Sequence, residues 1–102
     1  MAAKYNIQAH KEGGVVTVTY DLSVRMAGSE LLATFQLFVM GKNLITDFSH
    51  GQQAYTGATT CVLDHPEKDA AVFFAISTNA GWTAHDQGFL RGEHDDDVSF
   101  EG

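Results

Sequence analysis

Apolar and polar residues alternate most clearly between Val15 and Met26. The apolar positions are Val16, Val18, Tyr20, Leu22, Val24 and Met26, and a polar residue stands between each pair. This period of two, rich in β-branched side chains, is typical of a strand with one buried face. A helix would scatter the same positions around its circumference. The pattern therefore predicts a half-buried strand.

The residues on either side of this segment predict a further strand and two turns. Tyr5, Ile7 and Ala9 also alternate, and the glycines of KEGG (residues 11–14) favour a turn between this first strand and the next. The residues Ala27-Gly28-Ser29 predict a turn on the far side.

The run ELLATFQLFVM (residues 30–40) has apolar positions that fit either a helix or a strand. The residues that follow favour a strand, because Gly41-Lys42-Asn43 has the chemistry of a tight hairpin loop. An apolar stretch then resumes over residues 44–48. We expect a hairpin here, with a helix over residues 30–40 as the alternative.

The rest of the chain carries shorter signals. Residues 49–60 are polar and predict a loop with a short strand near Tyr55. The remaining segments are a β-prone stretch over Thr59–Leu63, a turn around Pro66, a core strand over Ala70–Ser77, and short final strands at Phe89–Leu90 and Val98–Phe100.

Strand and turn signals thus recur about every ten residues along all 102 residues. That spacing is typical of a small antiparallel β-sandwich or barrel, and the length fits one domain. We expect an all-β fold of seven or eight short strands with at most one short helix. Residues 1–102 would form one domain, with an acidic C-terminal region over residues 85–102.

The charge balance excludes some partners. Thirteen acidic and six basic residues give a net charge of −7, which argues against nucleic acid and anionic membranes. No apolar run is long enough to span a membrane, and the first residues lack an apolar signal core. A single cysteine, Cys61, cannot form an internal disulfide. These features predict a cytoplasmic protein.

The acidic region over residues 85–102 holds six of the 13 acids and only one basic residue, Arg91. One interpretation is a solvated edge that resists pairing with other strands. Another is a calcium site, because Asp95, Asp97 and Glu101 alternate and would share one face of a strand. A third is a docking surface for a basic partner. The spacing does not complete an EF-hand loop, since Phe100 stands where glycine is needed.

Histidines, the cysteine and the serines give no catalytic motif. His85 and His94 each precede an aspartate, and a carboxylate beside the imidazole is the kind of support that a zinc-binding histidine uses. No HxxxH or CxxC pair accompanies them. Cys61 lies in the β-prone TTCVL and is expected to be buried and inert. GxSxG and the phosphate-binding glycine motifs are absent. The sequence predicts a protein that is not an enzyme and needs no cofactor, with calcium as the alternative.

Trp82 is the only tryptophan and lies in the polar segment STNAGWTAHDQG. With Asn79, His85 and Asp86 nearby, it could stack on a sugar ring or anchor a protein partner. Packing in the core is the alternative interpretation.

Three functions remain open. The first is a non-catalytic binding or assembly module that meets a protein partner or copies of itself. Its interface would include Leu32, Phe38 and Met40, which point outward if residues 30–40 form a half-solvated strand. The second is a lectin-like module that binds carbohydrate or calcium, and the third is a small enzyme.

Overall fold

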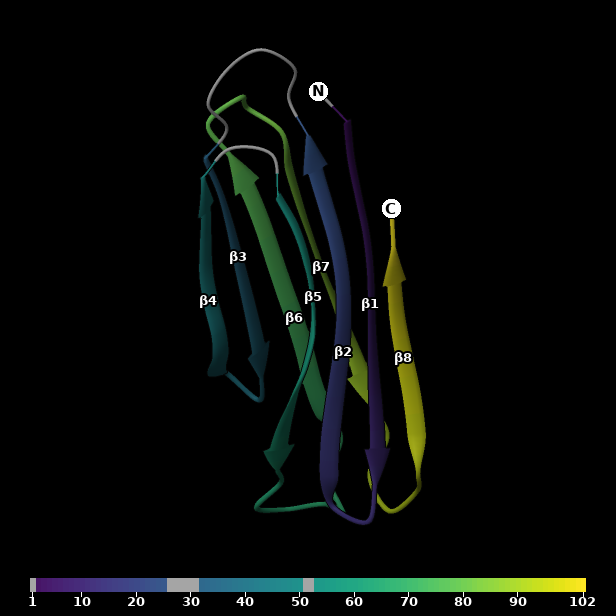
Figure 1. Ribbon diagram of the computed structural model, residues 1–102. Helices are drawn as coiled ribbons and strands as arrows, with labels where there is room; N and C mark the ends of the chain where they lie inside the picture. Colours follow the sequence, from purple (N-terminus) through teal and green to yellow (C-terminus); the bar gives the residue numbers. More distant parts are fainter. Residues whose placement is uncertain (1, 26–31, 51–52) are drawn as a thin grey trace.

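The computed structural model describes residues 2–25, 32–50 and 53–102, and it shows two antiparallel sheets of four strands packed against each other (Figure 1). The strand orders are β5-β2-β1-β8 and β4-β3-β6-β7. The strands are β1 (Ala2–Glu12), β2 (Val15–Arg25), β3 (Leu32–Val39), β4 (Lys42–His50), β5 (Gln53–Val62), β6 (Ala70–Thr78), β7 (Thr83–Leu90) and β8 (Asp96–Glu101). The predicted all-β sandwich is confirmed. None of the described residues belongs to a helix that could span a bilayer.

Two-residue turns join the strands of two hairpins. Gly13 and Gly14 connect β1 to β2, as the KEGG motif predicts, and both have positive φ angles, +57° and +88°. Met40 and Gly41 connect β3 to β4, also with positive φ at both positions. Turns of this kind match the twist of the flanking strands. The helix alternative for residues 30–40 is wrong from Leu32 onward, and the turn lies one residue earlier than the predicted loop.

Alternation builds the core between the sheets. The buried side chains come from every second position of the central strands and include Ile7, Val16, Val18, Leu22, Phe35, Leu37, Val72 and Phe74. The Phe74 ring lies with its centroid 5.1 Å from that of Tyr5 and 5.2 Å from that of Phe100. Tilted ring pairs at this separation are favourable. Both sheets therefore contribute aromatic rings to one core.

Several strands are longer than their sequence signals indicate. Apart from residues 51 and 52, which lie outside the described residues, the predicted loop over residues 49–60 is wrong, because β4 continues to His50 and β5 runs over Gln53–Val62. Gly57, a turn signal in the sequence, pairs with Tyr20 instead, and a Cβ atom there would lie 2.5 Å from the Tyr20 hydroxyl oxygen. Glycine in this strand thus leaves room for a ring, as glycine often does where another group approaches closely.

Lys11 is buried at one end of the sandwich, on the same face of β1 as Ile7 and Ala9. Its ammonium donates hydrogen bonds to the backbone carbonyls of Pro66, at 2.5 Å, and Arg91, at 2.8 Å. Buried charged groups need such partners. Lys11 therefore ties the loop after β5 to the loop after β7.

The sandwich is elongated, with principal extents of 49 × 19 × 19 Å. Its two broad outer faces belong to different sheets, and they differ in chemistry.

Candidate functional site

The outer face of β3, β6 and β7 carries no charged side chain among the described residues. Alternation and register place on it Thr34, Gln36, Phe38, Ala71, Phe73, Ala75, Ser77, Thr83, His85, Gln87 and Phe89. None of these is Asp, Glu, Lys or Arg, although the chain contains 19 such residues. A surface of this size without charge is unusual on an acidic protein.

One end of this surface is aromatic. Phe38 and Phe73 are register partners on β3 and β6, with ring centroids 5.9 Å apart. Phe89, on β7, is 59% exposed and pairs with Ala71. We call these four residues the aromatic face. A hollow of about 330 Å³ lies over Phe38, Ala71 and Phe73 and is bordered by Gly41 and Gln87.

The predicted interface residues lie at or beside this aromatic face. Phe38 is part of it. Met40, 55% exposed, lies in the adjoining turn, where its sulfur accepts a hydrogen bond from the Ala71 backbone amide at 3.2 Å. Leu32 begins β3, but its side chain lies outside the described part of the chain.

Sequence reasoning missed Phe73 and Phe89 as surface residues. The run AAVFFAIS predicts one apolar core strand. Which of its side chains face inward is decided only when a partner strand fixes the register. The register of β6 with β3 places Val72 and Phe74 inward and Phe73 outward. Because residues 70–76 are all apolar, the sequence carries no signal of which phenylalanine faces outward.

The opposite outer face, formed by β5, β2, β1 and β8, is polar and charged. Asn6, Gln8, Thr19 and Asp21 line a shallow hollow of about 210 Å³ on β1 and β2. A second hollow of about 240 Å³ adjoins it, with Glu101 at its border. Amide, hydroxyl and carboxylate groups thus replace the aromatic rings of the other face.

The four residues predicted to bind a sugar do not converge on one site. Trp82 is half-buried and packs against the core, with its ring centroid 6.5 Å from that of Tyr5. Asn79 is exposed in the turn between β6 and β7. His85 and Asp86 are neighbours on β7 and point to opposite sides of that strand. Trp82 is therefore a packing residue here.

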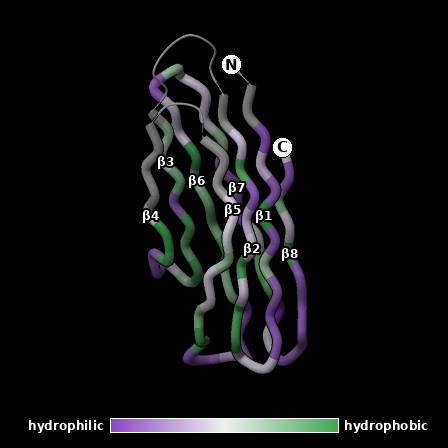
Figure 2. Tube along the Cα trace, viewed as in Figure 1, coloured by the Kyte–Doolittle hydropathy of each residue, from purple (hydrophilic) through white to green (hydrophobic). Residues whose placement is uncertain are grey.

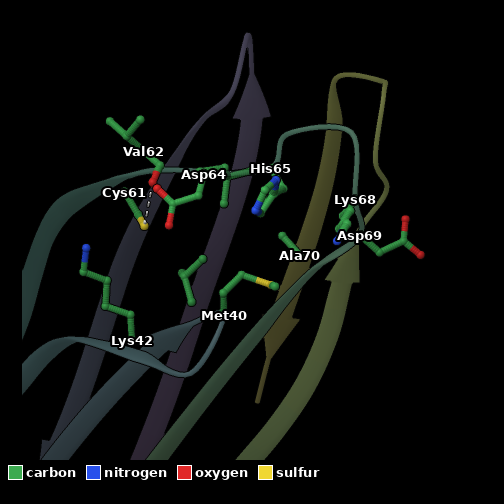
Figure 3. Close-up of a pocket in the computed structure, with 11 residues that line it drawn as sticks. Met40, Lys42, Cys61, Val62, Asp64, His65, Lys68, Asp69 and Ala70 are labelled. Carbon is green, nitrogen blue, oxygen red and sulfur yellow. Dashed lines mark hydrogen bonds between the residues drawn. The ribbon is translucent and has the colours of Figure 1, made fainter.

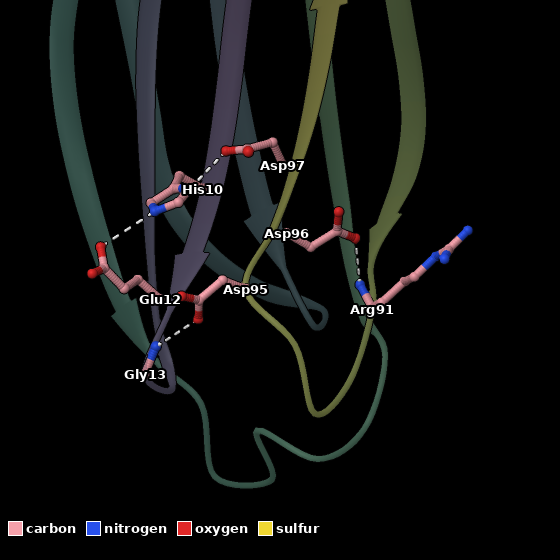
Figure 4. A network of polar contacts seen from close by, with 7 residues as sticks. All are labelled: His10, Glu12, Gly13, Arg91, Asp95, Asp96 and Asp97. Atoms are coloured by element: carbon pink, nitrogen blue, oxygen red, sulfur yellow. Dashed lines mark hydrogen bonds and ion pairs between the residues drawn. The ribbon is translucent and has the colours of Figure 1, made fainter.

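The acidic run at the start of β8 makes three separate contacts (Figure 4). Asp95 accepts a hydrogen bond from the Gly13 backbone amide at 3.3 Å, and Asp96 accepts one from the Arg91 amide at 2.8 Å. An oxygen of Asp97 lies 2.6 Å from Nδ1 of His10. Hydrophilic residues gather along this part of the chain (Figure 2). The run thus joins β8 to the β1–β2 hairpin and to the end of β7.

These contacts shift two pKa values. The hydrogen bonds to Asp97 and then Glu12 raise the pKa of His10 above its ordinary value. Hydrogen bonds from the backbone amides of Arg91 and Asp97 lower the pKa of the Asp96 carboxyl. Protonated His10 can donate to both of its acidic neighbours, Asp97 and, at 3.3 Å, Glu12.

The candidate metal ligands are spread along β8 and the loop before it. Asp97 and Glu101 share the outer face of β8, as the alternation predicts, and Asp95 lies just before the strand. In residues 2–25, 32–50 and 53–102, no three or more His, Cys, Asp or Glu side chains form a group that could hold a metal ion. Cys61 is buried, as expected. The calcium site stays a prediction.

Comparisons with known proteins give no guide to the function. No family model matches the chain, and neither the curated proteins nor the solved structures contain a match. The uncharged aromatic face is therefore the candidate functional site on the geometry alone.

Proposed function

We propose that this protein is a non-catalytic assembly module whose copies associate through the outer face of β3, β6 and β7. The observation that carries the proposal is the coincidence, on one sheet face, of one exposed and two half-exposed aromatic rings with a lack of charged side chains among the described positions. Exposed apolar patches usually mark interaction sites, and aromatic residues are enriched among the residues that dominate interface energies.

Charge restricts a second copy of the chain to this face. Each copy carries a net charge of −7, so most orientations bring like charges together. The described outer positions of β3, β6 and β7 include no Asp or Glu. Two copies that meet through this face therefore bring no carboxylates from these positions together. The polar face would instead oppose acids such as Asp21 and Glu101.

The sheet edges support association through a face. Asp86 lies on the inward side of edge strand β7, and Asp97 lies on edge strand β8. Charged residues on edge strands hinder pairing with a strand of another molecule. Strand pairing is therefore hindered at the β7 and β8 edges, and stacking of two sheet faces is the geometry we propose.

Removal of an aromatic ring from the face tests the proposal. Phe38→Ser and Phe73→Ser should each weaken association by about 2 kcal/mol, which is roughly 30-fold in the dissociation constant. Sedimentation equilibrium measures that constant for each variant and for the parent.

Val62→Ser is the matched control, because Val62 is 74% exposed on the other sheet. It should leave the dissociation constant unchanged. Thermal unfolding must show that the serine variants remain folded. Equal weakening by Val62→Ser, or no weakening by either phenylalanine variant, would count against the aromatic face.

The second candidate function is glycan binding, and a specific observation favours it. The hollow over Asn6, Gln8, Thr19 and Asp21 presents amide, hydroxyl and carboxylate groups, which are the groups that bind sugar hydroxyls. We expect the parent to bind members of a glycan array and Gln8→Ala to bind them at least tenfold more weakly. An array without a binding partner for the parent would remove this candidate.

A further inference from the structure

A cavity of about 420 Å³ opens at one end of the sandwich, between the β3–β4 turn and the loop that joins β5 to β6 (Figure 3). Its wall is apolar. Val39, Cys61 and Ala70 are buried there, and Leu63 is half-buried. Cavities of this size and lining are typical of small-molecule sites. The cavity is separate from the aromatic face, whose rings point away from the core.

Two lysines lie at the mouth of this cavity. Neither the Lys42 nor the Lys68 ammonium has a hydrogen bond or ion pair with any described residue. Lys42 extends its ammonium toward the side of the cavity that carries Cys61 (Figure 3). The mouth thus offers two free cationic groups on a protein with only six basic residues.

Two acids, Asp64 and Asp69, balance the formal charge of the two lysines, but the two carboxylates are placed differently. Asp69 accepts a hydrogen bond from the Gly92 backbone amide at 2.8 Å, and Figure 3 shows its carboxylate pointing away from the cavity. Asp64 is the single carboxylate directed into the space (Figure 3). Asp69 is thus turned away from the cavity, and Asp64 is the carboxylate that a bound anion would have to avoid.

We propose that this cavity binds a small organic anion with an apolar body, such as a medium-chain carboxylate. The apolar body would occupy the space between Val39, Leu63 and Ala70, where it leaves water. The carboxylate would accept a charge-assisted hydrogen bond from Lys42 or from Lys68, which lie on opposite sides of the cavity (Figure 3). This ligand site is independent of self-association.

Cys61 provides a direct reporter of occupancy, because it is the only cysteine and its side chain lines the cavity. The experiment measures the rate at which methyl methanethiosulfonate modifies Cys61, by intact mass, during a titration with octanoate. Saturating octanoate should slow the modification at least fivefold. Octanol, which has the same chain without the charge, should bind at least tenfold more weakly.

The double variant Lys42→Gln/Lys68→Gln should weaken octanoate binding at least tenfold and leave octanol binding unchanged. Lys4→Gln, an exposed lysine of β1, is the matched control and should bind octanoate like the parent. Absence of protection by octanoate would overturn the proposal. Equal protection by octanol, or an unchanged octanoate affinity in the double variant, would overturn the assignment of an anion.

Discussion

Met40 occupies a backbone conformation that its residue type disfavours. Its φ angle is +53°, and it shares the β3–β4 turn with Gly41, whose φ is +74°. In such a turn both central residues need positive φ, and Asn-Gly is the preferred pair. A residue with a Cβ atom and no local polar group costs roughly 1–2 kcal/mol in the left-handed region. Met40, which lies beside the aromatic face, therefore lowers the free energy of unfolding relative to a residue that tolerates positive φ.

Met40→Asn should stabilise the folded chain by about 1 kcal/mol, because asparagine tolerates positive φ. For a domain of this size that gain raises the melting temperature by roughly 4–8 °C. The measurement is thermal unfolding in a Phe38→Ser background, so that association does not contribute.

Met40→Leu is the control, since it keeps both the apolar side chain and the positive φ. It should show no gain in melting temperature. If Met40→Asn also fails to raise the melting temperature, then strain in this turn does not limit the stability of the protein.

For Lys11, the buried position could be predicted from the sequence, but its hydrogen-bond partners could not. The alternation of Tyr5, Ile7 and Ala9 extends to Lys11 and places it on the buried face of β1. Its carbonyl partners belong to Pro66 and Arg91, which are 55 and 80 residues away in the chain. Local sequence carries no information on contacts that arise only when two loops meet.

At the scale of elements, strand β8 is attached to β1 by side chains as well as by backbone pairing. His10 and Asp97 are register partners on these two strands, and their side chains are in contact. The raised pKa of His10 means that folding favours its protonated form. This contribution to stability is present below the unfolded pKa, about 6.5, and is lost as pH rises through the folded pKa.

Asp97→Asn should lower the pKa of His10 toward its ordinary value, because it removes the acceptor that contributes most to the shift. The pKa is measured from the His10 ring signals in an NMR pH titration. Stability should then fall less than in the parent as pH rises from about 6.5 through the folded pKa.

Glu101→Gln is the control, since it removes a charge from the same face of β8 without touching the contacts of His10. It should leave the raised pKa in place. An ordinary pKa for His10 in the parent would show that the contact with Asp97 is absent in solution.

Central strands with one apolar face could be predicted from the sequence, whereas the edge strands β5 and β7 could be predicted only in part. β2 follows its alternation, with Val16, Val18 and Leu22 buried. β5 was predicted only near Tyr55 and from Thr59 onward, because its inward side carries Gly57 and Thr59 in place of large apolar side chains. Gly57 resembles a turn residue, although it lies beneath the Tyr20 ring. β7 was predicted only at its last two residues, because an edge strand buries few side chains.

At the scale of the whole molecule, the two outer faces divide the chemistry of the protein. The face of β5, β2, β1 and β8 carries acids, amides and hydroxyls, and the described outer positions of β3, β6 and β7 carry aromatic rings without charge. Phe38 and Met40 could be named from the sequence. Phe73 and Phe89 could not, because strand order and register, which one sequence does not specify, bring them beside Phe38.

The solution mass of the parent protein tests the central claim most directly. Light scattering on a size-exclusion column at neutral pH, over a series of loading concentrations, measures that mass. Association through the aromatic face predicts a mass that rises with concentration toward at least twice the 11.1 kDa of one chain. A mass of one chain at every concentration up to the millimolar range would contradict the proposed self-association.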